Sequence, residues 1–201
     1  MKLNEQKKIL HLGWLIAGGF FLSVASFACA FFFPVDFSTD PPTFHPMIMV
    51  LGQMQTAFYI LGCTGLGIKL AEEKKTIPSI GFTMMSIAQG VIFVLYLISV
   101  NSHEKVEEAF KMFSASLFLL IPSMILIAFY SEFPRWLNIA GILACVPYLV
   151  ENIIFSFTRH ITMTSTMIDL TGNTMFNIVA VCWGIIVLRN AGREAEMKRE
   201  K

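Results

Sequence analysis

The sequence predicts an all-α fold, a polytopic membrane helix bundle of six transmembrane helices with both termini in the cytoplasm. Three observations predict this class. First, 55% of the 201 residues are hydrophobic and only 14% are charged, whereas soluble domains carry roughly 25% charged residues. Second, the apolar residues form six long runs. Third, Lys and Arg are concentrated on one side of those runs.

Each run is long enough to cross a bilayer, which takes roughly 20 mostly apolar residues. In lipid the backbone must satisfy its own hydrogen bonds, so continuous runs of this length favour helices over strands. The chain is then a single domain, residues 1–201, with a cytoplasmic tail at 189–201 that we expect to be a frayed helix. The expected spans are Ile9–Phe33, Met47–Ile68, Ile77–Val100, Phe110–Tyr130, Trp136–Phe157 and Leu170–Leu188.

The first run is the one that a signal peptide could imitate. A basic stretch, Met1–Lys8, precedes it, and Ala28–Ala30 resembles a cleavage site. Its apolar stretch is about 25 residues, beyond the roughly 7–15 of a signal peptide, so an uncleaved helix is favoured.

The distribution of basic residues predicts the orientation, because Lys and Arg gather in cytoplasmic segments. With six helices, one side carries twelve of them and the other carries three. The twelve are Lys2, Lys7, Lys8, Lys69, Lys74, Lys75, Arg135, Arg189, Arg193, Lys198, Arg199 and Lys201, and the three are Lys105, Lys111 and Arg159. All three Trp fall toward the cytoplasmic ends of their helices, as in an aromatic belt: Trp14, Trp136 and Trp183.

The outer loops offer little sign of a metal site. The first, residues 34–46, is acidic, rich in proline and free of Lys and Arg, so it favours an extended or turning path. No outer histidine has a second such ligand at a local spacing such as i, i+4, so we expect solvated loop residues and no bound metal. The residues concerned are His45, His103, His160, Asp36, Asp40, Glu104 and Asp169.

Several other functions lose support. A net charge of +1 predicts no nucleic-acid partner. The four cysteines (Cys29, Cys63, Cys145 and Cys182) form no Cys-x-x-Cys pair, so they are interpreted as packing residues rather than redox centres. No pair of intramembrane histidines could hold a haem, no mid-membrane Lys could hold retinal, and phosphate-loop and protease motifs are missing from the sequence. We therefore expect no cofactor.

Glu151 is the strongest single clue to a functional site. It lies about 7 Å beyond the centre of the fifth span, at ~1.5 Å per residue. A charged side chain at such depth costs between ~2.5 and 10 kcal/mol or more. We therefore expect Glu151 to be neutral much of the time and to face protein or a wet cavity.

Other polar residues lie at comparable depth. Tyr148, Glu151 and Asn152 share a stripe on their helix by i, i+3 and i, i+4 spacing, and Pro147 frees a carbonyl there. On the second helix Gln53 and Gln55 point about 200° apart, and Gln55 shares the face of Tyr59. The full set of candidates for binding a ligand or proton is Glu151, Tyr148, Asn152, Asn177, Asn173, Gln55, Gln89 and Tyr59.

The fifth span also carries a family resemblance. Phe133-Pro134-Arg135-Trp136-Leu137, Gly141-Ile142-Leu143 and Tyr148-Leu149-Val150-Glu151 resemble an uncharacterised bacterial family of six-helix membrane proteins, a domain of unknown function. The specific stretch is about 20 residues, and the long acidic first loop and Pro147 depart from the pattern. The resemblance implies a six-helix bundle in a bacterial inner membrane and assigns no catalytic role.

Three functions remain open. A carrier, channel or sensor would bind a small molecule or ion in an outward-facing polar pocket around Glu151. A structural or accessory subunit would use the same side chains as interhelical hydrogen bonds, at roughly 0.6 kcal/mol each, and would bind another membrane protein. An intramembrane enzyme is the least favoured, because no catalytic spacing is present. The bilayer is the one partner that all three share.

Overall fold

The computed structural model describes residues 2–36, 38, 43–101, 106–158 and 163–200. It is built of six helices: α1 (Lys2–Ala30), α2 (Pro46–Glu72), α3 (Thr76–Asn101), α4 (Val106–Ile127), α5 (Arg135–Thr158) and α6 (Met163–Glu200). The all-α prediction is confirmed. The expected residues Asp40, His103, Glu104, Lys105, Arg159 and His160 lie outside the described residues, and the side chain of Lys111 is not described.

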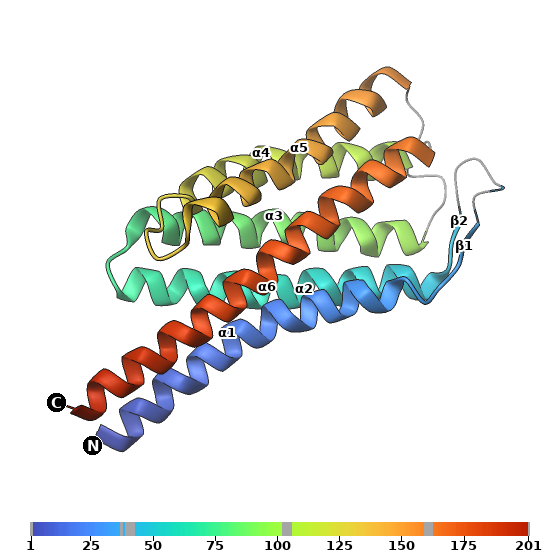
Figure 1. Cartoon of the computed structure of the whole chain (residues 1–201). Helices are drawn as coiled ribbons and strands as arrows, with labels where there is room; N and C mark the ends of the chain where they lie inside the picture. Colours follow the sequence, from blue (N-terminus) through green and yellow to red (C-terminus); the bar gives the residue numbers. More distant parts are fainter. Residues whose placement is uncertain (1, 37, 39–42, 102–105, 159–162, 201) are drawn as a thin grey trace.

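The helices form a ring in chain order. Each helix packs against the next one along the chain, and α6 closes the ring by packing against α1 (Figure 1). Both termini therefore lie at the same end of the bundle (Figure 1). Helix direction alternates all the way round the ring, because α1 and α6, which close it, also run antiparallel (Figure 1).

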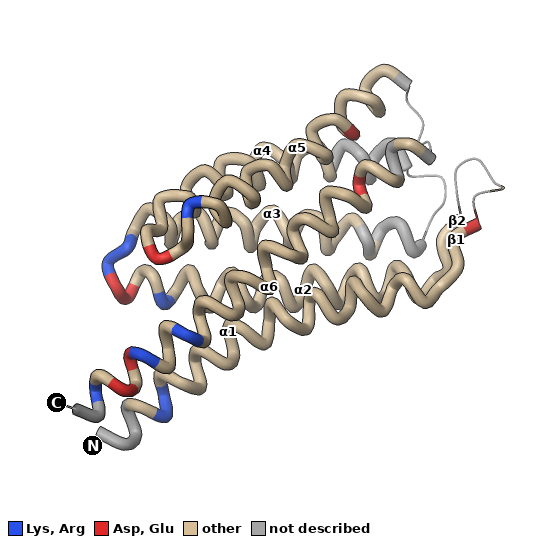
Figure 2. Tube along the Cα trace, viewed as in Figure 1, with Lys and Arg blue, Asp and Glu red and all other residues tan. Residues whose placement is uncertain are grey.

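Five of the helices are long and apolar enough to cross a membrane: α1, α2, α3, α5 and α6. The described apolar part of α4, Phe113–Ile127, is shorter. Charged residues are concentrated at the end of the bundle that holds the termini, and the middle of the bundle is almost free of them (Figure 2).

Two expected spans extend beyond the C-terminal ends of the helices observed there. Helix α1 ends at Ala30 rather than at Phe33, and α4 ends at Ile127 rather than at Tyr130. In both cases the apolar residues continue into a turn, with hydrogen bonds to the third residue before, such as Phe33 N to Ala30 O at 3.2 Å. A proline follows each turn, at Pro34 and Pro134, and the residue before a proline disfavours helix.

The first outer loop contains a short hairpin that the sequence did not predict. Strands β1 (Val35–Asp36) and β2 (Thr43–Phe44) pair antiparallel, with Val35 opposite Phe44. The ring of Phe33 stacks on His45, with centroids 5.1 Å apart. His45 also caps α2, because its Nδ1 accepts a hydrogen bond from the Met47 nitrogen at 3.2 Å.

An aromatic cluster fills the centre of the bundle, and it corrects one expectation. Trp183 was expected in an interfacial belt, but it is 1% exposed. Its ring contacts Phe20 of α1 and Phe82 of α3 at centroid distances of 5.7 and 5.1 Å, and it stacks on Phe133 at 5.9 Å. Trp14 and Trp136, by contrast, are about 60% exposed. The hydropathy pattern predicted where Trp183 lies along its helix. It did not predict that the side chain points into the bundle.

Helix α6 does not end where the expected span ends. It continues as one helix of 38 residues through the charged segment 189–200. Ala191 and Ala195 are buried there, and Gln6 of α1 donates a hydrogen bond to the Ala195 carbonyl at 3.0 Å. The tail is therefore held against the first helix.

Candidate functional site

Glu151 lies on the face of α5 that packs against α6. One turn earlier, the ring of Tyr148 lies 5.6 Å from that of Phe176 on α6. A Cβ atom added at Gly172 of α6 would lie only 3.0 Å from the same tyrosine ring. The Glu151 side chain is 8% exposed, and its Oε2 atom is buried without a hydrogen-bond partner among the described residues. Such a buried acceptor requires a functional or structural explanation.

Asp169 of α6 is the acidic neighbour that the sequence reasoning missed. It interacts electrostatically with Glu151 and accepts a hydrogen bond from the side chain of Asn173. The expected sixth span began at Leu170, which placed Asp169 in a loop, whereas α6 begins at Met163. The signal that could have found it is the spacing of Asp169, Asn173 and Asn177, which repeats every four residues and makes one helical stripe.

Asn173 joins this acid pair to α2. The side-chain nitrogen of Gln55 donates a hydrogen bond to Asn173 Oδ1 at 3.3 Å. Asn177 donates from its own amide to the Asn173 carbonyl at 2.7 Å. The structure thus brings together Gln55, Asn173 and Asn177 from the predicted set, and it places Gln55 rather than Gln53 in contact with α6.

Tyr59 lies one helical turn beyond Gln55, on the buried face of α2. It is 3% exposed, and neither its hydroxyl nor the Asn177 Oδ1 atom has a hydrogen-bond partner among the described residues. Tyr59 also packs edge-on against Phe20, with ring centroids 5.7 Å apart. Two helices that run in the same direction, α2 and α6, therefore carry polar groups in matched turns, with the acid pair at the end of the bundle away from the termini.

Two predicted residues do not join this group. Asn152 lies on the side of α5 that faces α4, where it donates a hydrogen bond to Ser114 Oγ at 2.7 Å. Gln89 is half-buried on α3 and forms no hydrogen bond among the described residues. Tyr148 packs beside this group, against Phe176 and Gly172 of α6. Five predicted residues and Asp169 make up what we call the acid-amide site: Glu151, Asp169, Asn173, Gln55, Asn177 and Tyr59.

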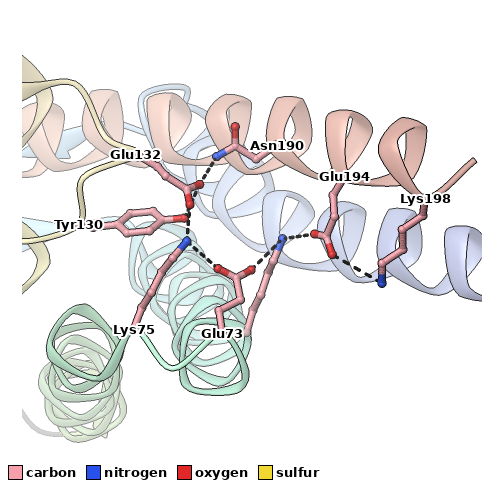
Figure 3. A network of polar contacts seen from close by, with 8 residues as sticks. Glu73, Lys75, Tyr130, Glu132, Asn190, Glu194 and Lys198 are labelled. Carbon is pink, nitrogen blue, oxygen red and sulfur yellow. Dashed lines mark hydrogen bonds and ion pairs between the residues drawn. The ribbon is translucent and has the colours of Figure 1, made fainter. Parts of the chain in front are cut away.

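A second polar group lies at the end of the bundle that holds the termini. Lys75, in the turn between α2 and α3, pairs with Glu73 at 2.8 Å and with Glu132 of the α4–α5 loop (Figure 3). Tyr130 and Asn190 donate hydrogen bonds to Glu132 Oε2 at 2.7 and 2.6 Å. Lys75 also lies 5.0 Å from the centre of the Tyr130 ring.

The same group extends along α6. Lys69 of α2 pairs with Glu73 at 3.6 Å and with Glu194 at 3.4 Å, and Glu194 lies 4.0 Å from Lys198. We call these residues the terminal network: Lys69, Glu73, Lys75, Tyr130, Glu132, Asn190, Glu194 and Lys198 (Figure 3). It connects α2, the α2–α3 turn, the α4–α5 loop and α6.

Contacts within the terminal network stabilise the charged forms of Glu132 and Lys75. Burial by itself raises the pKa of the Glu132 carboxyl, but the hydrogen bonds from Lys75 and Tyr130 outweigh burial and hold that pKa below its usual value. Burial likewise opposes the charge of Lys75, yet its bonds to Glu132 and Glu73 raise its pKa. Burial and the Glu132 bond raise the pKa of Tyr130, so this hydroxyl stays a donor.

Within the described ranges there is neither a cluster of typical metal-binding side chains nor a pair of joined thiols. Within the described ranges, no group of three or more His, Cys, Asp or Glu side chains could hold a metal ion. The four cysteines are unpaired thiols, with Cys63 and Cys145 buried and Cys29 exposed.

Two open clefts lie away from Glu151. One, of about 460 Å³, is formed by the hairpin loop and lined by Pro34, Val35, Asp36, Phe44 and His45. The other, of about 470 Å³, lies beside the terminal network and is lined by residues 74–78 and 129–131. Neither contains a residue of the acid-amide site.

Comparison with known proteins adds no assignment to this geometry. No family model, no curated protein and no solved structure matches the chain.

Proposed function

We propose that the chain is a multi-pass membrane protein in which α4 provides a sixth span and both termini lie in the cytoplasm. The topology supports this, because α3 and α5 run in the same direction and α4, which packs on both, carries the chain back along the bundle between them (Figure 1). The twelve-to-three division of basic residues supports the orientation. The resemblance described above suggests a bacterial inner membrane.

Its proposed function is to bind a proton or small ligand at the acid-amide site, as a carrier or sensor. The observation that carries this proposal is the buried, unpartnered Glu151 oxygen beside a second carboxyl, Asp169. Ionisable residues within a membrane are costly, and they commonly mark ion pathways and proton relays. A purely structural pair would place the Glu151 oxygen against a donor.

The alternative function, a structural or accessory subunit, has some support. The Gln55–Asn173 and Asn152–Ser114 bonds join helices, as interhelical amides in a stable bundle do. Against it, most of the glycines that could dock a partner pack within the bundle instead. A Cβ at Gly19 would lie 2.6 Å from the Gly62 nitrogen, and one at Gly184 would lie 2.8 Å from the Phe21 ring.

Glu151→Gln separates these functions, because glutamine keeps the shape of the side chain and cannot ionise. The purified protein would be followed by infrared spectroscopy of its protonated carboxyl band over a pH series. A binding site predicts that the variant stays folded and loses one titrating carboxyl. Glu196→Gln, at an exposed position on α6, is the matched control and should leave the intramembrane band unchanged.

Two results would contradict the proposal. One is an unchanged carboxyl titration in a folded Glu151→Gln protein. The other is a Glu151→Gln protein that fails to fold, because that outcome identifies Glu151 as a residue that holds the helices together.

A further inference from the structure

We propose that the ligand of the acid-amide site is a dehydrated alkali cation, such as sodium, which competes with a proton for the oxygens around Glu151. This inference rests on the proposed function and specifies its ligand. Three features of the site carry it: the room available, the chemistry of the unpartnered atoms, and the charge balance.

The room available excludes a large ligand. Glu151 is 92% buried, since its exposed fraction is 8%, so little of its surface could contact an organic molecule. Tyr148 and Gly172 close the same α5–α6 interface at a contact distance that would not admit even one added methyl group without a shift. Such tight packing favours a ligand as small as a proton or an ion without its hydration shell.

The chemistry of the unpartnered atoms favours a cation. Glu151 Oε2 is an acceptor without a donor, and Asp169 adds a second carboxylate beside it. The amides of Asn173 and Gln55 bond to each other, and Asn173 also bonds to Asp169, which fixes the position of these groups. Oxygen ligands suit hard cations. Mg²⁺ retains several waters, and a buried carboxyl in close packing offers no room for them.

The charges of the described residues favour a positive partner. Among those residues, no ion pair joins a Lys, Arg or His side chain to Glu151 or Asp169. From α6, Asp169 is the ionisable group that faces Glu151. The described side chains of α4, Phe113–Ile127, include no ionisable group, and α2 contributes only Tyr59 and Cys63 on its buried face. Two carboxyls in such surroundings need protons or a cation, because unpaired buried charge is strongly unfavourable.

The test is thermal unfolding of the full-length protein in detergent, with sodium chloride exchanged for choline chloride at constant ionic strength. Sodium should raise the melting temperature, and the concentration at half-effect should increase about tenfold for each pH unit of acidification where one proton competes. Glu151→Gln and Asp169→Asn should abolish the sodium effect. Glu196→Gln should keep it.

The wild-type competition and a milder variant test the sodium site without relying on Glu151→Gln. Asn173→Ser shortens the amide that positions Asp169 and should weaken sodium binding severalfold. Titration of the Glu151 carboxyl without any alkali-cation effect would overturn this inference and leave the proposed function standing. Stabilisation by Ca²⁺ or Mg²⁺ alone, or a sodium effect that survives in Glu151→Gln, would also overturn it.

Discussion

The side chain of Gln55 on α2 donates a hydrogen bond to Asn173 on α6 at 3.3 Å, across the interior of the ring of helices. These two residues are 118 positions apart in the chain. Their contact connects the acid pair on α5 and α6 to the buried face of α2, so it sets the geometry of the whole acid-amide site.

A double-mutant cycle would measure this contact. We expect Gln55→Leu and Asn173→Leu to be coupled by about 0.6 kcal/mol, the average for a hydrogen bond between transmembrane helices. The readout is unfolding in mixed micelles. The matched control is Gln53→Leu with Asn173→Leu, which should show coupling near zero, because Gln53 is on another face of α2. Equal coupling in both cycles would contradict the assigned face.

The close approach of α1 and α2 gives a second prediction. A Cβ atom at Gly19 would lie 2.6 Å from the Gly62 nitrogen and 2.9 Å from the Phe58 carbonyl oxygen. These are backbone atoms that cannot turn aside, so Gly19→Ala must separate the helices. Overpacking of this kind costs typically 1–3 kcal/mol.

Gly18→Ala is the control for that substitution, because a Cβ at Gly18 meets nothing within 4 Å. Both variants add the same methyl group to the same helix, one residue apart. We expect Gly18→Ala to leave the melting temperature unchanged or to raise it slightly. A Gly19→Ala protein as stable as Gly18→Ala would show that the two helices do not meet at Gly62.

The terminal network predicts a pH dependence of stability. Because Glu132 has a lowered pKa in the folded protein, its contribution is present at neutral pH and is lost as the pH falls through that folded pKa. Lys75 has a raised pKa, so its contribution persists at neutral pH and is lost only when strong alkali deprotonates it. Both groups therefore stabilise the fold near neutrality.

Glu132→Gln should remove the acid-side part of this dependence. Its side chain is 38% exposed, so solvent screens its ion pair, and we expect a loss at neutral pH of about 0.5 kcal/mol. Added salt should reduce the difference between the wild type and the variant. Glu196→Gln, which changes the same charge outside the network, should reproduce neither the pH effect nor the salt effect.

The sequence predicted the helices well and the site in part. Run length and composition identify a spanning helix without knowledge of its neighbours, so all six helices were placed. Helical phase also selected Gln55 over Gln53. The helical periodicity alone could not show that Asn152 faces α4, because a polar residue of α5 can form hydrogen bonds with the helix on either side of it.

The missed residues have two physical causes. Asp169 was taken for a loop residue because hydropathy detects apolar segments, and α6 begins seven residues before the apolar run. The terminal network joins Lys75, Glu132 and Glu194, which lie in three separate segments of the chain. Such contacts depend on how loops converge, and no local pattern encodes that.

The unbroken length of α6 has a mechanical consequence. At about 1.5 Å per residue its 38 residues make a rod of about 57 Å, longer than the bilayer is thick. Asp169 sits near one end of this rod and Glu194 near the other. The aromatic cluster around Trp183 lies between them. Because a rigid rod moves as one body, we expect a spectroscopic label on exposed Met197 to report a tilt of α6 caused by ligand binding beside Asp169.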